Sequence, residues 1–255
     1  MTLDIQQQAA RRMRRAVFAL GGIIVVLVVV IVVIAVTGGR STNNDSSNSP
    51  APGTSATGEP EPVETLPDDG GYVAPEEYVK LPDGTSKAGN LPIKFARTPE
   101  GAAAAGVAAT RNAYSWNAAQ VRAGINTYSA AAYRDEMAAQ VEESVKANRE
   151  YAGIPATGPV PEGATLSAWP IGVQWQRETS NSVDLLILLR VTYSAGTGEK
   201  STTNLVVTPT RAVWESGDWK VEPTPPSENL PDPVDIGTAR FNLDGWKAIQ
   251  EGERL

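Results

Sequence analysis

The sequence contains no cysteine and no histidine among its 255 residues. Without cysteine the chain has no disulfide, no lipidated cysteine and no thiol nucleophile; without histidine no imidazole binds a metal or transfers a proton. The nucleotide-binding patterns of P-loops and of glycine-rich dinucleotide sites are absent too, as is the GxSxG pattern of serine hydrolases. The sequence therefore predicts no catalytic residue, no metal and no cofactor, and we expect that the protein is not an enzyme.

Negative charge outnumbers positive charge beyond the first 15 residues. The chain carries 22 Lys and Arg against 29 Asp and Glu, a net charge of −7. Residues 37–90 alone hold nine acidic and three basic side chains. An acidic surface gains nothing from the release of counterions on nucleic acid, so we expect no direct nucleic acid binding.

A wholly apolar run extends from Ala16 to Val36. Its 21 residues include no charged or hydrogen-bonding side chain, and as a helix they span roughly 31 Å, the hydrocarbon thickness of a bilayer. The alternative is a cleaved signal peptide, whose apolar core is normally about 7–15 residues and therefore shorter than this run. The sequence predicts an uncleaved transmembrane helix at residues 16–36.

Arginines before this run predict its orientation. Residues 1–15 form a basic stub with four arginines, whereas only Arg40 follows closely after the span. Positively charged residues are favoured on the cytoplasmic side of a membrane. We expect a single-pass protein of the plasma (inner) membrane with a cytoplasmic N-terminus, so that the rest of the chain lies outside the cytoplasm.

Residues 37–90 are rich in Gly, Pro, Ser, Thr, Asn and acidic residues. From Gly38 to Gly71 almost no large apolar side chain occurs, so this stretch cannot bury enough surface to offset the entropy lost on ordering. Its acidic pairs, Asp68–Asp69 and Glu76–Glu77, indicate a solvated tract rather than a calcium site. The sequence predicts a disordered linker that tethers an extracytoplasmic domain at residues 91–222.

Three helices are predicted at the start of this domain. Thr98, followed by Pro99 and an acid, is a helix start, and this helix extends to about residue 116. A short helix is expected at 118–127. A third, at 130–151, has an apolar face typical of an amphipathic helix packed on the domain, formed by Tyr133, Met137, Val141 and Val145.

Four strands are predicted after the helices. Apolar residues alternate along 167–176 and 183–193. A long strand is expected at 200–214 and a short strand at 219–221. In the second strand Leu186 and Leu188 make the other face apolar as well, so this strand should be central. The short connections require an antiparallel meander. The first strand should direct Trp169, Ile171, Val173 and Trp175 to one face, and the core should also include Trp214 and Trp219.

Asp184 and Arg190 are the charged residues on the second face of the central strand. If they pointed into a cavity, they would form a buried pair of functional interest. The alternative is that they reach solvent or pair with residues of neighbouring strands.

The tail, residues 223–255, is rich in proline and ends in a predicted short helix at Gly245–Gln250. Its apolar side chains, Trp246 and Ile249, would dock either on the domain or on a partner. We therefore select Trp246 and Ile249 as the candidate protein-interface residues.

Three helices followed by a meander that ends on Gly217–Val221, with the sequence Gly-Asp-Trp-Lys-Val, resemble the nuclear transport factor 2-like (cystatin-like) fold. With the anchor and linker, the layout resembles the bitopic assembly proteins of type IV secretion and the TcpC-like conjugative transfer proteins. The segment Leu91–Ala102 is similar to uncharacterised membrane proteins of actinobacterial mobile elements. The expected fold is thus α+β: an N-terminal transmembrane helix, a disordered linker, and a cone of three helices on a curved four-stranded antiparallel sheet.

The resemblance implies a non-enzymatic scaffold with no catalytic residue to carry over. Its implied partners are the membrane and other membrane proteins of a transfer or secretion complex, or further copies of the chain. Two other functions remain open: a small-ligand-binding or transport-accessory protein that uses the cone pocket, and an anchored sensor. A filled cone would favour the scaffold, and an open pocket with convergent polar groups would favour the ligand-binding protein.

Overall fold

The computed structural model of this chain describes residues 71–224 and 230–250. The predicted basic stub, the membrane helix at 16–36 and the linker up to residue 70 lie outside the described residues, as do residues 225–229 and 251–255 of the predicted tail. Within the described ranges, no helix combines the length and the apolar character needed to cross a membrane.

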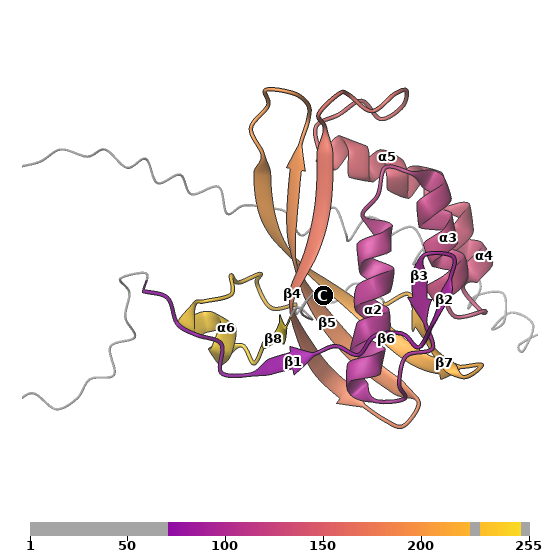
Figure 1. The fold of residues 1–255 in the computed structure, drawn as a ribbon, viewed down its shortest axis with the longest axis vertical. Coiled ribbons are helices and arrows are strands. Elements are labelled where there is room, and N and C mark those ends of the chain that lie inside the picture. The colour runs from indigo at the N-terminus through magenta and orange to yellow at the C-terminus, as the bar shows by residue number, and fades with distance from the viewer. Residues whose placement is uncertain (1–70, 225–229, 251–255) are drawn as a thin grey trace, which may run out of the picture.

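The described residues form an α+β domain in which helices pack on a strongly curled, mixed, six-stranded sheet. Figure 1 shows α2 lying across the hollow of the sheet, with α3, α4 and α5 grouped beside it. These helices are α2 (Pro99–Ala113), α3 (Ala118–Tyr128), α4 (Arg134–Ala139) and α5 (Val141–Tyr151).

The helices α2 and α3 begin where the sequence predicts, because each has a side-chain cap. Thr98 Oγ1 accepts a hydrogen bond from the backbone N–H of Gly101 at 3.1 Å. Asn117 Oδ1 accepts from the N–H groups of Ala119 and Gln120. These bonds satisfy N–H groups that have no partner within the helix. The first two predicted helices are confirmed.

The predicted third helix, at residues 130–151, is instead two helices. They are separated at Gln140, whose backbone angles are φ −96° and ψ 1°. No residue of α4 is buried, whereas Val141 and Val145 of α5 are buried against Val121 of α3. The second half of the predicted apolar face therefore packs on another helix and is buried, whereas Tyr133 and Met137 in the first half are only partly buried.

The main sheet contains the predicted antiparallel meander and two additional strands. In order across the sheet the strands are β1 (Tyr78–Lys80), β8 (Lys247–Gln250), β4 (Thr165–Glu178), β5 (Ser182–Ser194), β6 (Thr202–Glu215) and β7 (Asp218–Glu222). The strand β8 is antiparallel to β4, and β1 is parallel to β8. The prediction of a four-stranded, wholly antiparallel sheet is therefore wrong, although its four strands are all present. A separate hairpin pairs β2 (Ser86–Ala88) with β3 (Leu91–Ile93).

The two additional strands could not be found from alternation, because they are only three and four residues long. Strand β1 and hairpin strand β2 lie in residues 71–90, which the sequence assigned to the linker. The predicted helix at Gly245–Gln250 is also wrong: these residues include strand β8, and the helix α6 (Ala239–Leu243) precedes it. Whether each of these short segments forms a strand depends on the strand with which it pairs, and that strand is distant in the sequence.

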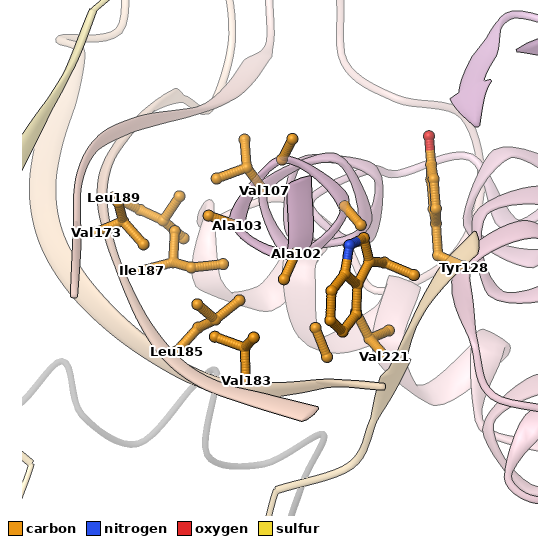
Figure 2. Close-up of a cluster of buried hydrophobic side chains, with 14 of the residues drawn as sticks. Ala102, Ala103, Val107, Tyr128, Val173, Val183, Leu185, Ile187, Leu189 and Val221 are labelled. Atoms are coloured by element: carbon orange, nitrogen blue, oxygen red, sulfur yellow. The ribbon is translucent and has the colours of Figure 1, made fainter. Parts of the chain in front are cut away.

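The concave core lies between α2 and the sheet. Leu185, Ile187 and Leu189 of β5 point into it and are at most 2% exposed. They meet the small residues Ala102 and Ala103 of α2, as Figure 2 shows. Because small side chains let a helix backbone approach closely, the helix fills the hollow of the sheet.

The convex cluster covers the opposite face of the sheet. Leu186 and Leu188 of β5 contact Val234, Phe241 and Trp246 of the tail. Because both faces of β5 are buried and β4 and β6 flank it, the prediction that this strand is central is confirmed. The tail is thus a third layer of the domain.

A bulge in β4 changes which of its residues face the helices. The pairing with β5 shifts by one residue at Ile171, which reverses the alternation beyond it. Trp169 and Ile171 pack in the convex cluster, whereas Val173 and Trp175 pack in the concave core. The expectation that these four side chains share one face is therefore wrong.

Candidate functional site

The two candidate interface residues both pack within this chain. Trp246 is 1% exposed in the convex cluster, where its ring lies 6.5 Å from that of Phe241, centroid to centroid. Ile249 is half-buried and packs against the concave core. Of the two docking alternatives left open for these side chains, the structure shows docking on the domain.

Asp184 and Arg190 form separate ion pairs on the convex side and do not pair with each other. Asp184 accepts two hydrogen bonds from Arg211 of β6, at 2.5 and 3.1 Å. Arg190 donates to Asp235 of the tail at 2.6 Å. The guanidinium groups of both pairs remain about 40% exposed. These contacts are the pairing with neighbouring segments that the sequence left as one alternative, and they do not line a cavity.

Apolar side chains fill the space between α2 and the curled sheet. Figure 2 shows Val183, Leu185 and Ile187 directed at α2, with Tyr128 and Val221 closing one side. The hollow of the sheet is therefore occupied by the protein itself.

Asp218 is the only buried carboxylate among the residues that the structure describes. Its Oδ1 accepts hydrogen bonds from the backbone N–H groups of Phe95 at 3.1 Å and Trp219 at 2.9 Å. Lys220 Nζ lies 3.4 Å from its Oδ2 and also donates to the carbonyl of Thr127. All of these partners belong to the fold. Asp218 joins β7 to the segment before α2, and its ion-pair partner Lys220 joins β7 to the last turn of α3.

Burial raises the pKa of the Tyr128 hydroxyl to about 12, and the nearby charge of Asp218 adds to this shift. The hydroxyl donates to the carbonyl of Pro92 at 3.1 Å. Burial also raises the pKa of Tyr114 and of Tyr151. The folded state therefore holds these protons more tightly than the unfolded chain does, so ionisation of any of these hydroxyls would destabilise the fold.

We expect the free energy of unfolding to fall as pH rises from 10 to 12. The stabilisation from neutral Tyr128 is complete below its unfolded pKa of 10 and is lost as pH rises to its folded pKa of about 12. Urea unfolding at several pH values measures this loss. The Tyr128→Phe variant, which has no proton to lose there, should show a smaller loss than the wild type. An equal loss in both proteins would assign the pH dependence to other tyrosines.

A groove of about 400 Å³ opens beside β4. The strand β8 pairs with β4 only at Gly172 and Val173, so the preceding residues of β4, including Trp169, lie at an edge of the sheet. The other walls are the last turns of α2, the loop between β1 and β2, and the end of β8. This volume falls within the range of small-molecule sites in proteins.

Arg111 is the charged residue that α2 contributes to this groove. Its guanidinium carbon lies 4.9 Å from the centroid of the Trp169 ring, a cation–π contact. Sequence reasoning did not select Arg111. The available signal was that Arg111 is the only charged residue between Gly101 and Ala113, in an otherwise small and apolar helix.

No group of three or more histidine, cysteine, aspartate or glutamate residues in the described ranges is placed to hold a metal ion. Comparisons with protein-family models, with curated proteins and with solved structures found no match to this chain.

Proposed function

We propose that this chain is a single-pass, membrane-anchored scaffold protein that assembles with other membrane proteins of a conjugative transfer apparatus similar to type IV secretion systems. The proposal takes its anchor and orientation from the apolar run at residues 16–36 and the arginines before it. It takes its biological setting from the resemblance of the sequence to bitopic transfer proteins.

The filled cone is the observation that carries the scaffold role. A ligand carrier of this architecture would need space between α2 and the sheet, and that space holds Ala102, Ala103 and the apolar residues of β5. Further support comes from the tail, which adds a third packed layer through Phe241 and Trp246. A rigid domain held away from the membrane by a long linker suits protein–protein assembly.

Deleting the gene from a transfer-competent cell should reduce DNA transfer to background, because the apparatus would lack one of its subunits. Expression of the full chain should restore transfer, and the frequency of recipient cells that acquire the element measures both effects. A variant with Val28→Glu and Val30→Glu should fail to restore it, since each acid at the centre of a membrane helix costs about 2.5–3.5 kcal/mol of insertion free energy.

The matched control is Val28→Leu with Val30→Leu, which keeps the run apolar and should restore transfer fully. Unchanged transfer after gene deletion would overturn the proposed function. Restoration by the glutamate variant would show that the anchor is not required. Affinity purification of the full chain from detergent-solubilised membranes should also recover a transport ATPase and polytopic membrane proteins.

A further inference from the structure

The groove beside β4 combines an apolar surface with one cation at its rim. Val107 and Ala108 of α2, Phe95 before that helix, and Ile249 of β8 supply apolar lining. Arg111 stands over Trp169, which belongs to the opposite element, the edge of the sheet. Polar groups make up a comparable part of the lining and can fix the orientation of a ligand, so the groove combines the two kinds of surface that small-molecule sites use.

A second arginine–tryptophan contact in the domain differs from that of Arg111, because its guanidinium also donates hydrogen bonds to the protein. Arg97 lies over Trp214, with 5.3 Å between its guanidinium carbon and the ring centroid. Its guanidinium is also engaged by the fold, because it donates hydrogen bonds to the carbonyl of Ser180 and the side chain of Asn181. Arg97 therefore joins two segments of the protein.

Arg111 makes no hydrogen bond or ion pair with any residue in the ranges 71–224 and 230–250. The Trp169 ring lies against the guanidinium of Arg111, while the guanidinium N–H groups remain available. A guanidinium presents these donors in the geometry that a carboxylate accepts, two parallel hydrogen bonds at once. The charge and the donors of Arg111 are thus complementary to an anionic oxygen pair.

The acidic residue of the lining limits the charge of the ligand. Asp83 belongs to the loop between β1 and β2, on a different wall from Arg111, and no ion pair joins the two side chains. A second carboxylate on the ligand would meet this negative charge. The lining therefore favours a ligand with one carboxylate and an uncharged body.

We propose that this groove binds a small organic monocarboxylate with an aromatic or branched aliphatic body. The carboxylate is held by the guanidinium of Arg111, and the body packs on Val107, Ala108 and Phe95. This site lies at the rim of the concave core, to which Val107 and Phe95 also belong. The inference does not depend on the proposed role in conjugative transfer.

The test is whether 4-phenylbutyrate binds to the full-length chain in detergent micelles. Saturation-transfer NMR measures the binding, and empty micelles serve as the blank. The wild type should show saturable binding, and 4-phenylbutyramide, which is uncharged, should bind at least about tenfold more weakly. Arg111→Gln should weaken binding of the carboxylate by about tenfold or more, since hydrogen bonds to charged groups contribute that much. Arg97→Gln, which changes the other stacked arginine, should leave it unchanged.

Ala108→Phe provides a second variant that fills the groove and keeps Arg111. It should abolish binding of 4-phenylbutyrate, with circular dichroism confirming that the domain is folded. The proposal is overturned if the wild type shows no saturable binding, if the acid and the amide bind equally, or if Arg111→Gln and Arg97→Gln behave alike. Binding that survives Ala108→Phe would place the ligand elsewhere and would overturn it as well.

Discussion

Replacing Trp246 by alanine should lower the free energy of unfolding by about 3–5 kcal/mol, the usual cost of removing a large aromatic side chain from a core. The indole fills the convex cluster between Phe241 and the outer face of β5. Its absence would leave a cavity and expose Leu186 and Leu188 to water. Chemical unfolding of the full chain, followed by tryptophan fluorescence and circular dichroism, measures the change.

Trp246→Phe is the matched control for this prediction. The indole N–H of Trp246 is buried without a hydrogen-bond partner in the described structure, so phenylalanine removes an unsatisfied polar group while it keeps an aromatic ring. We expect a loss of less than about 1.5 kcal/mol for this variant. If Trp246→Ala kept wild-type stability but lost a binding partner, Trp246 would be an interface residue, as one sequence-based alternative had it.

Replacing Gly101 by alanine should lower the free energy of unfolding by about 2–3 kcal/mol, although the same change in an exposed helix stabilises by up to about 1 kcal/mol. A Cβ atom at this position would lie 1.9 Å from the carbonyl oxygen of Ala96. That oxygen cannot move away freely, because it accepts hydrogen bonds from Thr98 N and from Trp219 Nε1, each at 2.8 Å. Thermal and urea unfolding of the variant measure the loss.

Gly106→Ala, in the same helix, is the control for this backbone clash. Its added Cβ would meet the ends of flexible side chains, with Leu185 Cδ1 nearest at 3.1 Å. These methyl groups can shift by a few tenths of an ångström, so the loss should be clearly smaller than for Gly101→Ala. Equal losses would mean that helix packing, and not the carbonyl of Ala96, limits the size of residue 101.

Local patterns were sufficient to predict the elements that are long or capped. The side-chain caps of α2 and α3 mark their first residues, and the alternation from Val183 to Tyr193 follows β5 closely. The same alternation was misleading in β4, because a bulge at Ile171 cannot be recognised from a strand without its partner. Strands β1 and β8 each exist through pairing with a distant segment, and nothing within their own few residues indicates it.

The candidate sites were less predictable than the fold. Trp246 can be selected from the sequence as an apolar residue in a proline-rich tail. Only the packing of that tail on β5 shows that Trp246 belongs to a core. The groove requires the sheet edge, the last turns of α2 and the loop between β1 and β2 to meet, and these segments are far apart in sequence. Arg111 could have been selected as the only basic residue of α2, although its contact with Trp169 could not have been predicted.

The pairing of β1 with β8 also bears on how the domain is made. Tyr78 and Ala248 are adjacent in the sheet but about 170 residues apart along the chain, so this contact closes the longest loop in the domain, and such closures slow folding. During synthesis, the meander β4–β7 leaves the ribosome before the segment that covers its outer face. Completion of the fold must therefore wait until residue 250 has been synthesised, and until then Leu186 and Leu188 lack the side chains that cover them in the finished domain.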